Sequence, residues 1–286
     1  MNKKIAVIGA GTMGSGIAQV AAEAGYDVVI VDTELKFVDY AINKVIKKLL
    51  ERKVEKGLIP LEECREIVSR LSGTTVRSDA VRGALMVVEA VFEDLDLKKS
   101  IMADLDGLCP EETILATNTS TFPITGIASV TKHPERVIGT HYFSPVPRMK
   151  LVEIIRGEKT SDEVTEKSID ICSNFGKKPV VVKDIPGFIV NRFLCLLYKE
   201  TADMIANGTR PQDVDTALKL GCNWPMGMAE LMDAVGVDIC YLATQAMHHM
   251  TGEDRYRPSP IMKEMYENKQ WGRKTGRGFY EYESKK

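Results

Sequence analysis

The sequence predicts an α/β protein in two parts, a doubly wound and mostly parallel sheet followed by an all-helical domain. The first observation is a glycine-rich turn directly after a short apolar run at 5–8. The second is an alternation of short apolar runs with longer amphipathic segments, which is the pattern of parallel strands joined by crossover helices. The third is that this alternation ends at 180–182, after which only helical patterns follow.

The elements of the first part follow from local patterns. Apolar spacing from Ile17 to Ala24 predicts a helix over 14–24, and Gly25 is the residue type favoured just past a helix end. A segment rich in lysine and glutamate predicts a long helix from about 34 to 56. Short apolar runs predict strands at 5–8, 28–31, 85–91, 114–117, 137–140 and 180–182.

Two further helices carry start signals. Asp94 can accept a hydrogen bond from the first turn of a helix that runs to Leu108. Thr160 and Glu163 match a capping box, in which each side chain bonds a backbone N–H at the start of the helix. We therefore expect helices to begin beside Asp94 and beside Thr160.

The change of pattern places a domain boundary just after Asp184-Ile-Pro-Gly187. We expect a first domain over 1–187, built on the sheet, and a helical domain over 188–286. Within the second domain, the run from Phe193 to Tyr198 is apolar on every side. Such a helix must be buried, either in the core of its own domain or against another subunit.

The composition excludes several classes of protein. The 286 residues are 44% hydrophobic and 27% charged, and 38 basic residues face 40 acidic ones. A net charge of −2 gives no general attraction for nucleic acid or for an anionic membrane surface. The longest apolar run, Phe193 to Tyr198, is far shorter than the ~20 residues that cross a bilayer as a helix. We expect a cytoplasmic protein that binds neither nucleic acid nor membrane.

The cysteines, the histidines and the amino end of the chain argue against disulfides, a metal site and a secretory signal. Six cysteines without a C-x-x-C pair indicate reduced, mostly buried thiols, and four histidines show no zinc-site spacing, so no metal is expected. The apolar segment at 5–8 is broken at once by glycines, where a secretory signal would continue as a longer apolar stretch. We interpret the amino end as a buried strand.

The turn Gly9-Ala-Gly-Thr-Met-Gly14 fits G-x-G-x-x-G, and it lies between a predicted strand and a predicted helix. In this Rossmann-like arrangement the first glycine allows the tight turn, the second admits a pyrophosphate and the third lets the helix pack closely. The helix amino terminus then presents N–H groups to the phosphates. Glycines also serve as plain turn residues, so the context carries the prediction. The candidate cofactor residues are Gly9, Gly11, Thr12, Met13 and Gly14.

Asp32 ends the second predicted strand, 21 residues after Gly11. A carboxylate at this place accepts hydrogen bonds from the adenosine ribose hydroxyls and repels a 2′-phosphate. The sequence therefore favours NAD over NADP as the cofactor. The alternative is that Asp32 is a simple turn or helix-cap aspartate. We rank this alternative below the ribose contact, because the position of Asp32 agrees with the glycine motif.

A histidine and a glutamate stand in apolar surroundings further along the chain. His141 follows the strand-like run 137–140, and Glu153 lies inside another short apolar run. A histidine can remove a hydroxyl proton near neutral pH, and a carboxylate beside its other nitrogen fixes the tautomer. NAD-dependent alcohol oxidation needs such a base. From spacing alone, a satisfied core histidine remains the first interpretation.

The chain resembles the L-3-hydroxyacyl-CoA dehydrogenases of the short-chain 3-hydroxybutyryl-CoA type over nearly its whole length. Several separate motifs in the right order carry the resemblance. They are Gly9-Ala-Gly-Thr-Met-Gly-Ser-Gly-Ile-Ala18, Ala116-Thr-Asn-Thr-Ser120, His141-Tyr-Phe-Ser-Pro145, Lys150-Leu-Val-Glu153, Asp184-Ile-Pro-Gly-Phe-Ile-Val-Asn-Arg192, Leu220-Gly-Cys-Asn-Trp-Pro-Met-Gly227 and Gly272-Arg-Lys-Thr-Gly-Arg-Gly-Phe-Tyr280.

The resemblance implies catalytic roles for four residues. His141 would be the general base and Glu153 its orienting partner. Ser120 and Asn191 would lie near the 3-oxygen of the substrate, where hydroxyl and amide donors stabilise developing charge. The alternatives are a turn hydroxyl for Ser120 and a solvent-facing helix amide for Asn191.

It also implies binding roles for a set of charged residues. Glu93, Lys98 and Lys274 match family positions around the nicotinamide half of the cofactor; otherwise they are ordinary surface charges. Lys53 and Lys56 belong to a basic cluster on the long helix where the family meets the coenzyme A phosphates, and the alternative is a solvated face.

Two positions depart from the family pattern. Ser144, near the nicotinamide carboxamide, stands where many relatives have asparagine, and this shorter side chain puts cofactor affinity in question. The stretch from Met228 reads Met-Ala-Glu-Leu where relatives commonly have a proline and a bulkier residue, which puts the acyl-chain preference in question.

The resemblance implies an NAD-dependent enzyme with an acyl-CoA substrate, which interconverts L-3-hydroxyacyl-CoA, such as 3-hydroxybutyryl-CoA, and 3-oxoacyl-CoA. It implies that the domain over 1–187 binds NAD and that the domain over 188–286 binds substrate and mediates dimerisation. The protein would then be a homodimer or a higher homo-oligomer. One alternative is a dehydrogenase of the same fold that acts on a free hydroxy acid, as the gulonate-oxidising relatives do. Another is an NAD-binding protein without catalysis. A nucleic-acid-binding protein is disfavoured by the charge balance.

Overall fold

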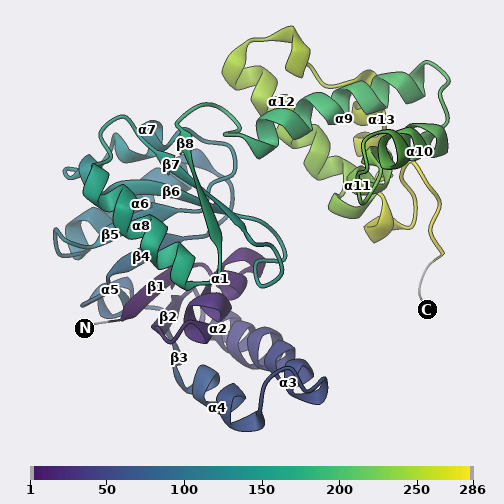
Figure 1. Ribbon diagram of the computed structural model, residues 1–286. Coiled ribbons are helices and arrows are strands. Elements are labelled where there is room, and N and C mark those ends of the chain that lie inside the picture. Colours follow the sequence, from purple (N-terminus) through teal and green to yellow (C-terminus); the bar gives the residue numbers. More distant parts are fainter. Residues whose placement is uncertain (1–2, 284–286) are drawn as a thin grey trace. The chain divides into compact units, whose positions relative to one another are not determined.

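The computed structural model describes residues 3–283 and contains two units (Figure 1). The first unit ends at Ile185 and the second begins at Pro186, two residues before the boundary expected from the sequence. The first unit is built around a sheet, and the second is helical.

The described part of the first unit holds an eight-stranded sheet in the order β3-β2-β1-β4-β5-β6-β7-β8. Neighbouring strands are parallel except for β6 and β7, which are antiparallel. The order of the first six strands places a topological switch between β1 and β4, and confirms the Rossmann-like prediction. The strands are β1 Lys4–Ile8, β2 Asp27–Val31, β3 Leu71–Thr74, β4 Met86–Glu89, β5 Ile114–Thr117, β6 Val137–Tyr142, β7 Leu151–Arg156 and β8 Lys178–Lys183.

Helices cover the sheet, and α3 and α4 project from it as a pair (Figure 1). The long helix predicted near 34–56 forms as α2, a π-helical segment and α3 in succession. The helical segments are α1 Thr12–Glu23, α2 Leu35–Asp39, the π-helix Tyr40–Ile46, α3 Lys47–Glu55, α4 Leu61–Ser69, α5 Arg77–Val81, α6 Leu95–Leu108, α7 Ile124–Ala128, a 3-10 turn Pro134–Arg136 and α8 Asp162–Asn174.

The two predicted helix starts have different outcomes. Asp94 accepts a hydrogen bond from the backbone N–H of Leu97, as expected for the cap of α6. The capping box at Thr160 and Glu163 is wrong, because Ser161 is the cap residue of α8. Thr160 is committed elsewhere: its hydroxyl donates to the carbonyl oxygen of Val137, which ties the loop to β6.

The second unit packs its helices around a core that includes Tyr198, Met232 and Cys240. From 186 to 283 the described residues form helices and isolated bridges but no named strand, as the sequence predicts. The helical segments are α9 Val190–Ala206, α10 Pro211–Gly221, α11 Met228–Val235, α12 Val237–Thr251, a 3-10 turn Asp254–Tyr256, α13 Pro260–Glu267 and a 3-10 turn Arg273–Thr275.

The apolar run in α9 is only partly buried within its own unit. Cys195 and Tyr198 face the core, whereas Phe193 is 64% exposed. Of the two alternatives, burial of the whole run in the core of its own domain is therefore wrong, because a helix presents one face to its core and turns the other outward. Burial of this outer face against another subunit stays a prediction.

The remaining sequence expectations concern thiols and membrane spans. All six cysteines are free, and five are buried while Cys222 is exposed, which agrees with mostly buried thiols. Between residues 3 and 283, no helix combines the length and apolar character needed to span a bilayer.

Candidate functional site

The glycine turn joins β1 to α1 with very little space. Gly9 has a φ of +108°, a conformation that favours glycine, and its N–H donates to the carbonyl oxygen of Val31 at 2.7 Å. A side chain at Gly14 would collide with the carbonyl oxygen of Gly9. Gly11 has nothing within 4 Å of an added Cβ. Two glycines thus serve close packing, and Gly11 leaves the space before the helix open.

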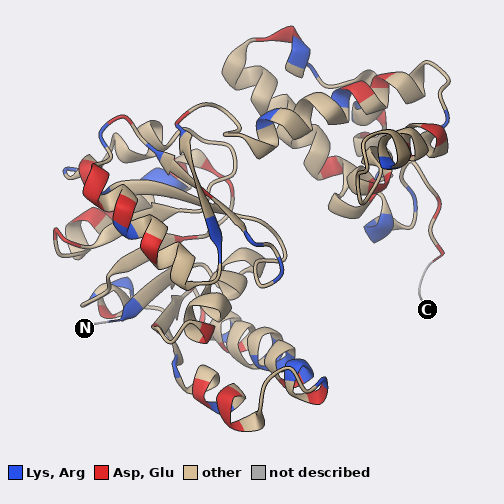
Figure 2. Ribbon diagram, viewed as in Figure 1, with Lys and Arg blue, Asp and Glu red and all other residues tan. Residues whose placement is uncertain are grey.

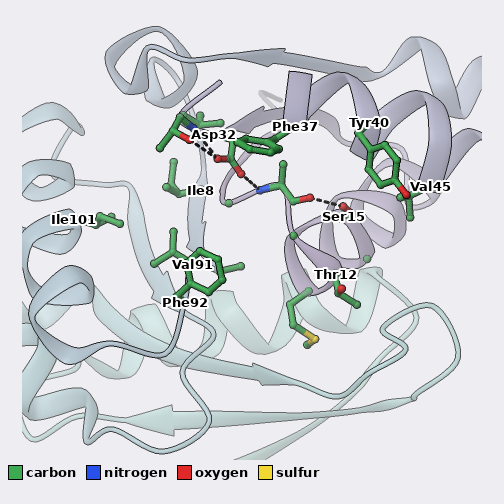
Figure 3. A pocket seen from close by; sticks show the side chains of 18 of the residues that line it. Ile8, Thr12, Ser15, Asp32, Phe37, Tyr40, Val45, Val91, Phe92 and Ile101 are labelled. Carbon is green, nitrogen blue, oxygen red and sulfur yellow. Dashed lines mark hydrogen bonds between the residues drawn. The ribbon is translucent and has the colours of Figure 1, made fainter. Parts of the chain in front are cut away.

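Asp32 lies beside this turn. Its Oδ2 accepts from the backbone N–H of Ala10, and its Oδ1 accepts from the N–H of Thr33, both at 2.7 Å. Figure 3 shows the carboxylate held in this way at the edge of the cavity. The carboxylate fixes the glycine turn and stays partly exposed, so a ligand can still reach it.

A cavity of about 1250 Å³ opens at the ends of β1, β2 and β4. Its lining includes Gly9 to Met13 and Asp32, and also Gly16, Gln19 and Tyr40. Figure 3 labels Asp32 and Tyr40 among the side chains around it. Among the described residues, Ser120, His141 and Glu153 are not part of this lining. The open Gly11, the helix amino terminus and the carboxylate together fit a dinucleotide, because they offer room, N–H donors and a ribose acceptor.

His141 and Glu153 form a buried pair on neighbouring strands. They are register partners between β6 and β7, and Nδ1 of His141 lies 2.7 Å from Oε2 of Glu153. The histidine is 5% exposed and the glutamate 1%. This contact assigns Nδ1 to the carboxylate, so that proton exchange with a substrate has to use Nε2. The centroid of the Phe143 ring lies 4.4 Å from the centroid of the imidazole.

Ser120, Glu93 and Lys98 belong to one polar network after β4 and β5. Glu93 Oε1 accepts from the Ser120 N–H at 2.8 Å, and Lys98 Nζ lies 3.2 Å from Glu93 Oε2. Lys98 is 1% exposed, so the alternative of an ordinary surface charge is wrong for it. Sequence reasoning missed its second partner, Glu89, which is fully buried. The available signal was a glutamate inside an otherwise apolar strand.

The loop between β6 and β7 carries Ser144, which is exposed. A side chain at Gly16 would collide with Val146, so this loop lies directly on α1. The ammonium of Lys177 donates to the carbonyl oxygens of Val146 and Met149 and thereby holds the loop. Burial lowers the pKa of Lys177, and the neighbouring Glu23 acts in the opposite direction.

The two candidate coenzyme A lysines differ. Basic residues gather along α3 (Figure 2). Lys53 Nζ lies 2.7 Å from Oε1 of Glu23, so its charge is already paired. Lys56 follows the helix and is exposed.

Two predicted site residues belong to the second unit. Asn191 lies in the first turn of α9 and is half-buried. Lys274 is exposed and its ammonium lies 2.6 Å from a carboxylate oxygen of Asp238. Their approach to the first-unit residues stays a prediction.

The chain is similar to a large set of known proteins. Residues 4–185 match the model described as "3-hydroxyacyl-CoA dehydrogenase, NAD binding domain", and residues 187–282 match the "C-terminal domain" of the same family. A 3-hydroxybutyryl-CoA dehydrogenase of Clostridioides difficile is 41% identical over 280 residues, which cover 98% of this chain and 99% of that protein. A mitochondrial hydroxyacyl-coenzyme A dehydrogenase of Rattus norvegicus is 42% identical, over 98% of this chain and 91% of that protein.

Solved structures agree with these relatives. The crystal structure of (S)-3-hydroxybutyryl-CoA dehydrogenase from Ralstonia eutropha matches with a TM-score of 0.95 and 37% identity, over 99% of this chain and 100% of that one. Family models, full-length relatives and structures thus point to one group. The chain belongs to the 3-hydroxyacyl-CoA dehydrogenase family and carries the NAD-binding domain of that family.

Proposed function

We propose that the protein interconverts L-3-hydroxyacyl-CoA and 3-oxoacyl-CoA with NAD, and that 3-hydroxybutyryl-CoA is its substrate. The observation that carries the proposal is the buried pair of His141 on β6 and Glu153 on β7. These strands belong to the same sheet as β1, whose end holds the glycine turn. The names of the relatives give the substrate class for those proteins. NAD, when bound, supplies the acceptor for the hydride that leaves carbon 3.

His141 is the proposed general base. In the oxidation direction its Nε2 takes the proton of the 3-hydroxyl, and in the reduction direction the imidazolium returns it. Glu153 holds Nδ1 and stabilises the charge that the ring gains. Base catalysis of this kind contributes roughly a hundred- to ten-thousandfold to the rate. Ser120 and Asn191 are the proposed donors to the 3-oxygen.

The cavity supports the contacts proposed for the adenosine and pyrophosphate part of the cofactor. The N–H groups of the turn from Gly11 to Gly14 would hold the pyrophosphate, and Asp32 the adenosine ribose. The contacts proposed for the nicotinamide half rest on the resemblance to the family, and none of them lines this cavity. They are Glu93, Lys98, Ser120, Ser144 and Lys274.

The coenzyme A phosphates would be bound at the basic end of α3. Of the two candidates, the exposed Lys56 is better placed than Lys53, because Glu23 already pairs with Lys53. An enzyme for a free hydroxy acid has no use for this basic cluster, which supports the ester as substrate.

The test follows NADH consumption with acetoacetyl-CoA and, in parallel, with acetoacetate. We expect turnover of the thioester and little with the free acid. Preference for acetoacetate would support the free-acid alternative, and binding of NADH without turnover of either would support a non-catalytic protein. Longer 3-oxoacyl-CoA esters then define the chain-length preference, which the sequence leaves open at Met228 to Leu231.

The proposed quaternary structure is a homodimer formed through the second unit. Apolar side chains on its surface support this, since Phe193, Ile239 and Leu242 are 64%, 50% and 45% exposed. Light scattering behind size-exclusion chromatography would give the mass in solution, and a monomer would contradict the proposal. Location in the cytoplasm stays a prediction, which cell fractionation would test.

A further inference from the structure

A buried charged cluster lies at the carboxyl ends of β4 and β5. Glu89 is the last residue of β4 and is 0% exposed, and Lys98, in the first turn of α6, is 1% exposed. Their ion pair joins Lys98 Nζ to Glu89 Oε1 at 2.8 Å. Burying two charged groups is costly unless each is paired and hydrogen-bonded, so a cluster like this one needs every one of its partners.

Glu89 uses both carboxylate oxygens inside the fold. Oε1 also accepts from the backbone N–H of Val91 at 2.8 Å, and Oε2 accepts from the hydroxyl of Thr117 at 2.6 Å. The hydroxyl oxygen of Thr117 in turn accepts from the N–H of Thr119 at 3.3 Å. Glu89 therefore connects the end of β4 with α6 on one side and with the segment after β5 on the other.

A second connection reaches the same segment through Lys98. Its ammonium also pairs with Glu93 Oε2, and Glu93 Oε1 accepts from the Thr119 hydroxyl at 2.6 Å, the Ser120 N–H at 2.8 Å and the Thr121 N–H at 3.1 Å. Because Glu89 shares the ammonium, Glu93 can keep one oxygen for these three donors. The positions of Ser120 and its neighbours thus depend on the Glu89 carboxylate, which acts on them through Lys98 and Glu93.

The sheet order tells which half of a dinucleotide meets this cluster. Strand β1 lies between β2 and β4, with Asp32 just beyond the end of β2 and Glu89 at the end of β4. A dinucleotide with its ribose at Asp32 and its pyrophosphate at the β1 turn must extend toward β4 and β5. Figure 3 shows Val91 and Phe92 on the far side of Ile8 from Asp32, and both line the cavity.

We propose that Glu89 is a positioning residue for the nicotinamide half of the cofactor. It anchors Lys98 and Thr117, and through them it sets Glu93 and the backbone of Thr119 to Thr121. The inference rests on the proposed cofactor placement. It predicts a selective defect: a variant of Glu89 loses affinity for the nicotinamide end and keeps affinity for the adenosine and pyrophosphate end.

The test compares NADH with ADP-ribose, which lacks nicotinamide, in calorimetric titrations of Glu89→Gln. Glutamine keeps the size of the side chain and can still accept from the Val91 N–H. It carries no charge, however, so Glu93 becomes the only carboxylate of the two that pairs with Lys98. We expect this stronger attraction to pull Glu93 away from the Ser120 N–H. We expect the NADH dissociation constant to rise about tenfold, the scale of a lost charged hydrogen bond, with ADP-ribose within about twofold. Equal loss for both ligands, or no loss, would overturn the proposal.

Two variants control the result. Asp106→Asn breaks a comparably buried ion pair with Arg136 near the other end of α6, and it should lower stability without changing the ratio of the two affinities. If Glu89→Gln does not fold, Thr117→Val is the deciding variant, because it removes one hydrogen-bond donor to Glu89. It should raise the NADH dissociation constant by a smaller factor and again leave the ADP-ribose dissociation constant nearly unchanged. Reduction of acetoacetyl-CoA by the unaltered enzyme tests the proposed function separately, so the two can fail independently.

Discussion

His141 and Glu153 face each other directly across the antiparallel strands β6 and β7, with Nδ1 and Oε2 2.7 Å apart. Register partners on adjacent strands project to the same face of a sheet, so the pairing itself creates the contact. A slip of one residue would send the glutamate to the opposite face. The loop 143–150, which joins the two strands, therefore helps to set the distance between the two side chains.

The first prediction concerns the base. His141→Ala should lower kcat roughly a hundred- to ten-thousandfold, because no other group takes over the hydroxyl proton. NADH affinity should be nearly unchanged, because the histidine is proposed to exchange a proton with the substrate hydroxyl and not to hold the cofactor. Stopped-flow absorbance with acetoacetyl-CoA and a separate NADH titration measure the two effects. Undiminished turnover would remove His141 from the mechanism.

Glu153→Gln should act through the histidine. Glutamine keeps the size and one acceptor, but it cannot stabilise an imidazolium by charge, so we expect kcat to fall roughly a hundredfold with little change in KM. Combining it with His141→Ala should cost almost nothing more, because both act on one proton transfer. Additive losses in this double-mutant cycle would show that Glu153 has a separate role.

The glycine turn offers a matched pair of substitutions. Gly14→Ala pushes a methyl group into the carbonyl oxygen of Gly9, so the free energy of unfolding should fall by about 1–3 kcal/mol. Gly11→Ala meets open space and should leave stability intact while weakening NADH binding, since the methyl group occupies the phosphate approach. Urea unfolding without cofactor and NADH titration separate the two. A stability loss in Gly11→Ala would contradict the assignment.

Asp32→Ala should weaken NADH binding, because it removes the ribose acceptor and also the hydrogen bond that holds the Ala10 N–H. Asp32→Asn is the informative companion: its amide oxygen keeps one of the two acceptors, and the charge that repels a 2′-phosphate is removed. Its NADPH affinity should rise relative to NADH. Unchanged NADH affinity in the alanine variant would count against the ribose contact.

Much of this arrangement follows from sequence because local patterns are strong there. The glycine turn, β5 and the Asp94 cap lie where their residues predict. Strand β3, Leu71–Thr74, is not evident from the sequence, since it contains Gly73 and lacks an apolar pattern; the glycine is needed because Val38 fills the space of a side chain.

The polar network around Glu89 and Lys98 could not be predicted from the sequence, for a different reason. Glu89 and Lys98 are nine positions apart and belong to a strand and a helix, so only the fold brings them together. The antiparallel direction of β7, on which the His141 contact depends, is likewise invisible to an apolar run, which has no direction. The proposed chemistry came from the resemblance to the family, whereas the contacts of the polar network follow only from the fold.

The last prediction concerns acid stability. Burial alone raises the pKa of Asp106, but the Lys132 N–H and the Arg136 guanidinium outweigh it and hold the pKa below its usual value. A carboxyl with a lowered pKa in the folded state adds stability above its unfolded pKa of about 3.9, and loses it as pH falls through the folded value. Asp106→Asn should therefore cost about 3 kcal/mol at pH 7, and less as pH falls below about 4. Urea unfolding of both proteins at pH 7 and pH 3 checks this, and an equal difference at the two pH values would show that the charge does not matter.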